Sequence, residues 1–109
     1  MNDGRVPAGA DASGRTSDAG PVVTRQVTIV NRKGLHARAA ARFVKLAGTF
    51  DAEISVAKRD AIVSGLSIMG LMMLAAAPGC PLELRATGRA ANEALAALAA
   101  LVERKFDED

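Results

Sequence analysis

Residues 22–47, VVTRQVTIVNRKGLHARAAARFVKLA, change from a strand pattern to a helix pattern and decide the kind of fold. Residues 22–30 are rich in β-branched side chains that alternate between two faces, which predicts a first β-strand. In residues 37–47 apolar side chains recur at the spacing of a buried helical stripe, and Gly48 closes the segment. A strand that leads through a short loop into a helix predicts a domain in which helices pack on a sheet.

The rest of the chain continues this alternation of strands and helices. Residues 52–63 read as a hairpin, and the final segment is strongly amphipathic. The expected order βαββαβα indicates an α+β fold, with helices covering one face of an antiparallel sheet. The expected strands are 22–30, 52–57, 62–63 and 81–88, and the expected helices are 37–47, 68–77 and 89–106. In the last helix the residues expected to face inward are Ala91, Leu95, Leu98, Leu101 and Val102.

The chain of 109 residues divides into an expected tail and one small domain. Residues 1–21 mix Gly, Ala, Ser, Asp and Pro with almost nothing able to pack. Ordering such a segment would cost entropy that no burial offsets, so we expect it to be disordered. The domain is expected over residues 22–109.

Composition excludes several classes of function. The chain has no Trp or Tyr and three Phe, which disfavours the stacking platforms of nucleic-acid binders. Its single cysteine, Cys80, rules out an internal disulfide, and its apolar neighbours suggest a buried thiol. The longest apolar run, residues 68–77, is shorter than the roughly 20 residues that cross a bilayer. With no signal peptide pattern at the start, we expect a cytoplasmic protein without membrane insertion.

Metal and nucleotide sites are not expected either. One histidine and one cysteine, far apart in the sequence, cannot supply the three or four ligands of a typical metal site. No glycine-rich phosphate loop follows a predicted strand. We therefore predict neither a metal nor another cofactor.

Charge is distributed unevenly around the one histidine, His36. No Asp or Glu occurs between Ala19 and Phe50, whereas Glu103, Asp107, Glu108 and Asp109 give the other end of the chain an acidic character. This asymmetry favours an anionic ligand near His36, although scattered charge is most often only solubilising surface. The basic residues of the acid-free stretch are Arg25, Arg32, Lys33, Arg38, Arg42 and Lys45.

His36 is expected at the point where a loop enters a helix. A lone histidine there is by default a surface or capping residue. Here, however, the free N–H groups of Ala37, Arg38 and Ala39 would point toward any group that the ring carries. Arg38 can fork onto phosphate oxygens, while Arg42 and Lys45 extend the positive field without touching the ring. The combination indicates a nucleophile beside an anion site, which suits transfer of a phosphoryl group.

Ser67 and the apolar segment after it form a second unusual feature. Ser67 is a good helix N-cap, which is sufficient reason for a serine at this position. The helix after it has no polar face, so some of its side chains are expected to remain exposed. We assign Ile68, Met69 and Met72 to an exposed docking patch, and a core position is at least as good an explanation for Met73 and Leu74. Phosphorylation of Ser67 would place a dianion beside this patch and weaken docking.

These two stretches, GLHARAA at 34–40 and SIMGLMML at 67–74, together resemble the HPr family, the histidine-containing phosphocarrier proteins of the bacterial phosphotransferase system. The resemblance covers residues 22–106, because the separation of the stretches and the order of elements also agree. It implies an open-faced β-sandwich with a four-stranded antiparallel sheet and three helices.

The resemblance also implies roles for individual residues. His36 would accept a phosphoryl group on Nδ1 from enzyme I, which is charged by phosphoenolpyruvate, and pass it to an enzyme IIA domain. Arg38 would attend that group, and Ser67 would be the serine that a dedicated kinase and phosphorylase modify. The docking residues would be Ile68, Met69, Met72 and Arg42. Such a protein is a monomeric carrier that is modified in each cycle, and it is not an enzyme by itself.

Two positions depart from the family's usual pattern. Ala39 stands where the family usually has proline, and Leu66 stands where many members have lysine before the serine. HARAA-type sites resemble the nitrogen-related branch, which serves regulation. The alternative function is therefore a regulatory binding module whose phosphorylation state controls its partners rather than sugar uptake.

Overall fold

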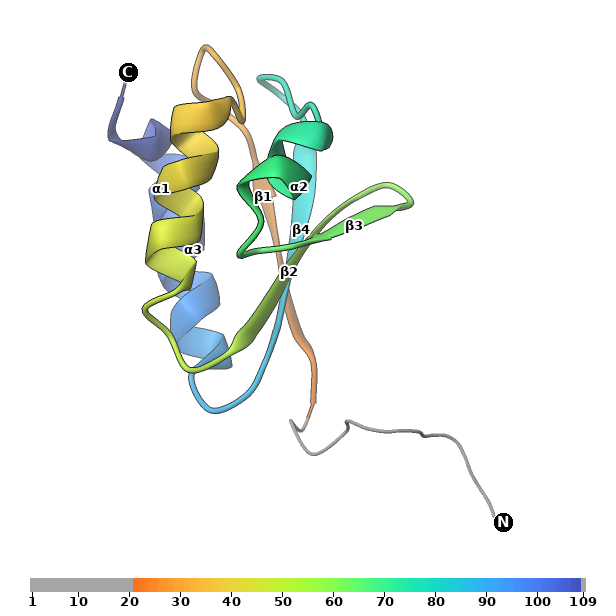
Figure 1. Ribbon diagram of the computed structural model, residues 1–109, viewed down its shortest axis with the longest axis vertical. Helices are drawn as coiled ribbons and strands as arrows, with labels where there is room; N and C mark the ends of the chain where they lie inside the picture. Colours follow the sequence, from red (N-terminus) through yellow and green to blue (C-terminus); the bar gives the residue numbers. More distant parts are fainter. Residues whose placement is uncertain (1–20, 109) are drawn as a thin grey trace.

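The computed structural model describes residues 21–108, and Figure 1 shows their arrangement. The predicted disordered tail, residues 1–21, lies outside the described residues except for Pro21. Seven main elements follow in the predicted order βαββαβα, with a short 3₁₀ turn after the last helix. The strands are β1 (Val23–Thr28), β2 (Glu53–Lys58), β3 (Ala61–Ser64) and β4 (Pro81–Thr87), and the helices are α1 (Ala37–Ala47), α2 (Ile68–Met73), α3 (Ala91–Glu103) and the 3₁₀ turn η2 (Lys105–Asp107).

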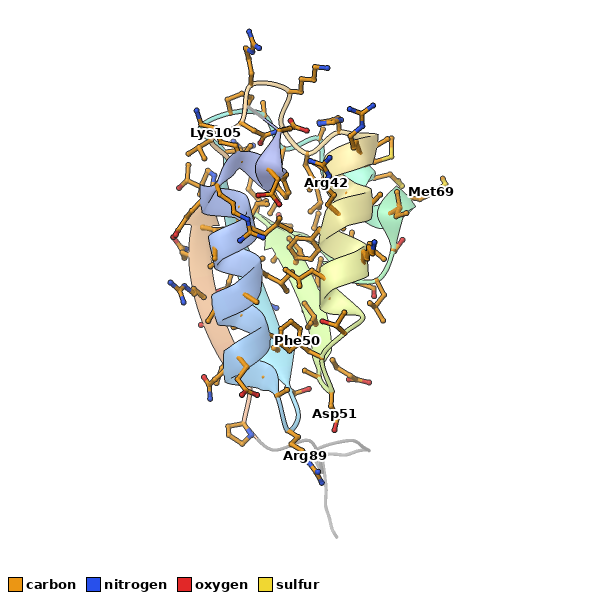
Figure 2. The ribbon with its side chains drawn as sticks, turned by 90° about the vertical axis from the view of Figure 1, so that its left-hand side faces the viewer. Arg42, Phe50, Asp51, Met69, Arg89 and Lys105 are labelled. Carbon is orange, nitrogen blue, oxygen red and sulfur yellow. The ribbon has the colours of Figure 1, made fainter. Side chains whose placement is uncertain are left out.

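The four strands form one antiparallel sheet in the order β1-β4-β2-β3. The first strand therefore pairs with the last one, and Val27 lies opposite Leu82. Helices α1 and α3 lie side by side on one face of the sheet, and α2 packs against α1 (Figures 1 and 2). This is the expected α+β fold, a four-stranded antiparallel sheet with three helices.

The core lies between the sheet and the helices and is built from alternating and helical patterns. In β4 the inward side chains Leu82, Leu84 and Ala86 are buried, as period-two alternation requires. The predicted stripe of α1 is buried at Ala40, Phe43 and Ala47, whereas Val44 is only partly covered. All five residues expected to face inward from α3 are buried: Ala91, Leu95, Leu98, Leu101 and Val102.

Helix α2 is shorter than the sequence predicts and ends at Met73 rather than at residue 77. The cause is local, because Ala75 takes a left-handed backbone conformation with φ of 52°. The ammonium group of Lys58 then donates hydrogen bonds to the Leu74 and Ala75 carbonyls, at 2.8 and 3.4 Å. Leu74 is buried, but Met73 is 78% exposed, so the alternative of a core position for Met73 is wrong.

Two further sequence predictions need correction. Cys80 is half-buried rather than buried, and its thiol lies 3.6 Å from the Pro81 carbonyl oxygen. The last helix was expected to continue to Phe106, but α3 ends at Glu103. Within residues 21–108, no helix is long and apolar enough to span a membrane.

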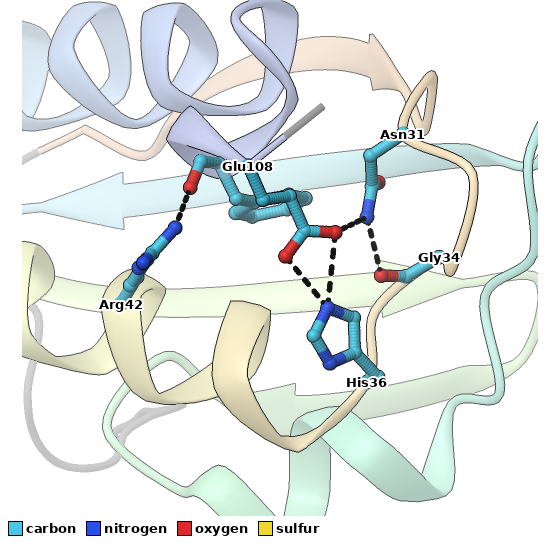
Figure 3. A network of polar contacts seen from close by, with 6 residues as sticks. Asn31, Gly34, His36, Arg42 and Glu108 are labelled. Carbon is cyan, nitrogen blue, oxygen red and sulfur yellow. Dashed lines mark hydrogen bonds and ion pairs between the residues drawn. The ribbon is translucent and has the colours of Figure 1, made fainter.

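The chain turns sharply after α3. Lys105, Phe106 and Asp107 have φ values of 61°, 55° and 63°, a left-handed conformation that costs roughly 1–2 kcal/mol for each residue other than glycine. The Phe106 side chain is completely buried, and the Arg42 guanidinium donates to the Phe106 carbonyl oxygen. Burial of the ring and the contact with Arg42 offset part of this backbone cost. The turn thereby directs Glu108 back toward the beginning of α1 (Figure 3).

Candidate functional site

The loop between β1 and α1 holds His36 in place through backbone contacts with the segment after α2. The Leu35 N–H donates to the Ala76 carbonyl oxygen at 2.9 Å. Gly34 has a φ of +68°, and a Cβ at this position would lie 2.4 Å from the same Ala76 oxygen. Only glycine therefore fits at this position, because the backbone of the segment after α2 lies so close. No pattern in the sequence identifies Ala76 as the neighbour of Gly34.

His36 is the N-cap residue of α1, as predicted. Its carbonyl oxygen accepts the Ala40 N–H at 2.8 Å, but its side chain forms no capping hydrogen bond. Within the described part of the chain, the N–H groups of Ala37, Arg38 and Ala39 have no hydrogen-bond partner. Unpaired amides and the positive end of the helix dipole make this end of α1 favourable for an anion.

The imidazole ring of His36 is held by a carboxylate from the other end of the chain. Nε2 lies 2.8 and 3.0 Å from the two carboxylate oxygens of Glu108 (Figure 3). The His36 side chain is 27% exposed and that of Glu108 is 12% exposed. A carboxylate accepts hydrogen bonds, so we assign the proton to Nε2, which leaves the lone pair of the neutral ring on Nδ1. Figure 3 shows Nδ1 on the side of the ring away from Glu108.

Asn31 supports this contact from the loop. Its side chain is completely buried, and its amide nitrogen donates to the Gly34 carbonyl and to Glu108 Oε2, both at 2.8 Å. Asn31 thus ties the loop to the side-chain carboxylate of Glu108 (Figure 3). From the sequence, Asn31 is expected only in a loop and Glu108 only in an acidic end, and neither was predicted as part of the site.

The basic residues of α1 fall into two groups. Arg38 and Lys45 are exposed. Arg42 is partly buried, and Figure 2 shows it on the side of α1 that faces the C-terminal turn, where it donates to Phe106. Of the two side chains expected to extend the positive field, Arg42 is therefore engaged in holding that turn, whereas Lys45 is exposed. Within residues 21–108, no group of three or more His, Cys, Asp or Glu residues could hold a metal ion.

Ser67 is the N-cap of α2, and its hydroxyl oxygen accepts the Gly70 N–H at 2.9 Å. Ile68, Met69 and Met72 are exposed, as expected, with Met69 72% exposed and projecting away from the other helices (Figure 2). Leu66 and Met73 are exposed as well. Because α2 packs against α1 and the segment after it contacts the loop before His36, the exposed apolar surface belongs to the same end of the molecule as the histidine.

Comparisons with known proteins agree with this geometry. Residues 23–104 match the family model described as "PTS HPr component phosphorylation site". The chain is 46% identical to the phosphocarrier protein HPr of Pseudomonas aeruginosa, over 76% of this chain and 93% of that protein. It is 48% identical to the phosphocarrier protein NPr of Shewanella violacea, over 77% of this chain and 92% of that protein.

Solved structures show the same similarity in three dimensions. The crystal structure of HPr from Thermoanaerobacter tengcongensis superposes with a TM-score of 0.76 at 41% identity, over 80% of this chain and 98% of that chain. HPr from Bacillus anthracis superposes with a TM-score of 0.72 at 42% identity, over 74% and 96% of the two chains. Sequence and fold therefore agree, and this chain belongs to the HPr family of phosphocarrier proteins, components of the phosphotransferase system rather than enzymes.

Proposed function

We propose that His36 accepts a phosphoryl group on Nδ1 from phosphorylated enzyme I and passes it to an enzyme IIA domain. The observation that carries this proposal is the orientation of the ring at the beginning of α1. Nε2 is engaged by Glu108, while Nδ1 lies on the other side of the ring, next to a helix end with unpaired amides. A nucleophilic nitrogen beside an anion site is the arrangement that phosphoryl transfer requires.

The groups around His36 would stabilise the phosphate in different ways. The N–H groups of Ala37, Arg38 and Ala39 are available as hydrogen-bond donors to phosphate oxygens. The guanidinium of Arg38 is exposed and can reach a phosphate as a two-pronged donor. Arg42 would contribute indirectly, because it holds the C-terminal turn that carries Glu108.

The test is incubation of the full chain with enzyme I and phosphoenolpyruvate, followed by addition of a IIA domain. We expect one acid-labile, alkali-stable phosphate per chain, on Nδ1 by ³¹P and ¹⁵N NMR, that then moves to the IIA domain. A phosphate on Nε2, or none at all with an enzyme I that charges another HPr, would contradict the proposal.

The exposed apolar surface around α2 is the proposed docking site for these partners. Methionine side chains adapt to different surfaces, and Ile68, Met69 and Met72 present one beside the histidine. We propose that the chain acts in the cytoplasm as a monomer, because one phosphorylatable histidine and one docking surface suffice for a carrier. No nucleic acid is among the proposed partners.

A regulatory role is the second candidate, and the similarity to an NPr protein favours it. In that role Ser67 would be a site for a serine kinase and phosphorylase. Phosphate on Ser67 would be compatible with the helix end that its hydroxyl already caps, yet it would add a dianion beside the apolar surface.

Affinity capture with Ser67→Asp tests this role, with Ser55→Asp on β2 as a control of equal charge. We expect the Ser67 variant to bind enzyme I and the IIA domain about tenfold more weakly, since like charge and desolvation oppose docking at α2. In this capture, a protein that serves transport alone would bind only enzyme I and the IIA domain. A regulator would also bind other proteins, and their binding would depend on whether His36 is phosphorylated. Equal binding by both variants would contradict a regulatory role for Ser67.

A further inference from the structure

Helix α2 carries three of the four methionines of the chain, Met69, Met72 and Met73. Residues spaced by three and four lie on the same side of a helix, so these three side chains form one surface, the methionine face. Met69 is 72% exposed, Met72 43% and Met73 78%. Figure 2 shows Met69 projecting away from the other helices. Small solutes can therefore reach this face.

Apolar docking alone does not require methionine, because leucine or isoleucine would present a similar apolar area. The thioether differs from these side chains in its chemistry. Two-electron oxidants add one oxygen atom to the sulfur, and the resulting sulfoxide is polar and accepts hydrogen bonds. Three thioethers on the proposed docking surface therefore make that surface sensitive to oxidants, which a surface of leucines would not be.

The structure confines the effect of such oxidation to docking. The inner side of α2 is filled by Leu71 and Leu74, which are both buried. The helix is held at its start by Ser67 and at its end by the Lys58 ammonium, which donates to the Leu74 carbonyl oxygen at 2.8 Å. A sulfoxide on the outer side finds hydrogen-bond donors in water, so it leaves the fold stable. A partner that covers the face removes this water, and the sulfoxide oxygen then opposes docking.

We propose that the methionine face is a reversible oxidation site that controls the docking of enzyme I. This inference rests on the proposed function. A sulfur lone pair forms the S–O bond as the O–O bond of a peroxide breaks, so the sulfur is oxidised by two electrons, the peroxide is reduced and water leaves. A methionine sulfoxide reductase reverses the change, because two thiols become a disulfide and the oxygen leaves as water. His36 takes no part in either step.

The experiment treats the full chain with hydrogen peroxide and locates the added oxygen by peptide mass spectrometry. We expect Met69 and Met73 to be oxidised before Met72, in the order of their exposure. The KM of the chain as a substrate of phosphorylated enzyme I is expected to rise about tenfold, while kcat changes by less than about twofold, because only docking is weakened. The melting temperature should change by less than about 3 °C. Methionine sulfoxide reductases for both sulfoxide epimers should restore the KM.

Two variants identify the responsible sulfur atoms. The first combines Met69→Leu, Met72→Leu and Met73→Leu, and the second is Cys80→Ser, which removes the one thiol of the chain. Each protein is compared with its own untreated form, so that any effect of the substitutions themselves on docking cancels. Peroxide is expected to raise the KM of Cys80→Ser as much as that of wild type, and to leave the KM of the triple leucine variant as it was before treatment. Backbone amide spectra verify that each variant is folded.

Sulfoxides on the methionine face with an unchanged KM would overturn the inference. An equal rise of KM in the triple leucine variant would overturn it too, because oxidation elsewhere in the chain would then be responsible. So would a large fall of the melting temperature, since the oxidised chain would then lose its fold rather than its docking. Failure of the untreated chain to accept a phosphoryl group would instead contradict the proposed function, so the untreated sample distinguishes the two failures.

Discussion

Replacing His36 by glutamine is expected to abolish phosphoryl acceptance while leaving the fold intact. The variant lacks the only imidazole of the chain, and a side-chain amide is not a nucleophile at neutral pH. The rate is expected to fall at least about a thousandfold, to the background of the assay. The side chain is only partly buried, and the glutamine amide can still donate to Glu108. The free energy of unfolding should therefore change by no more than about 1 kcal/mol.

Two measurements check this result together. Transfer of labelled phosphate from enzyme I gives the rate, and urea unfolding followed by circular dichroism gives the stability. The exposed residue Asn92, at the far end of α3, offers a control, since Asn92→Gln makes a comparably small change and is expected to leave both quantities as in wild type. Acid-labile phosphate that persists on the His36 variant would place the acceptor elsewhere.

Truncation of Phe106 to alanine is expected to have the largest effect on stability. The ring is completely buried, and removing a buried phenyl group typically costs about 3–5 kcal/mol. A domain of this size has roughly 5–15 kcal/mol in total, so the melting temperature should drop by more than about 10 °C. The variant also loses the anchor of the strained turn, and Glu108 is expected to leave His36.

Phe50→Ala is the matched control for this experiment. Phe50 is partly buried and lies at the opposite end of the helical layer from Lys105 (Figure 2). Its truncation should destabilise the chain less and leave the ¹⁵N shifts of His36 unchanged in the folded state. Equal ring shifts in the two variants would show that Phe106 does not hold the site.

Much of the fold could be predicted because the elements have strong local patterns. The helix from Ala37 to Ala47 agrees with the structure at both ends, since a capping position precedes it and Gly48 follows it. Period-two alternation located β1 and β4 to within about two residues. The end of α3 was predicted incorrectly because Phe106 continues the apolar spacing of Val102. The structure buries this ring through a left-handed turn instead.

Only the part of the site that is local in the sequence could be predicted. His36 and the first turn of α1 are neighbours in the sequence, so their juxtaposition follows from the helix start alone. Glu108 is 72 positions away from His36, and its place depends on how α3 ends. The charge pattern of the sequence indicates an acidic end of the chain, but it does not indicate where that end lies in the fold. The signals present in the sequence were Phe106, an apolar residue inside that acidic end, and Asn31 directly after the strand expected at residues 22–30.

The pairing of β1 with β4 has a consequence for biosynthesis. The first strand cannot find its neighbour until residues 81–87 have been made, so the sheet closes late on the ribosome. Sheets in which strands far apart in the sequence must pair also fold slowly, because a long stretch of chain must first be closed into a loop. The carboxylate of Glu108 emerges later still. A nascent chain therefore exposes its histidine before the partner of that histidine exists, and it gains a complete site only after translation has passed residue 108.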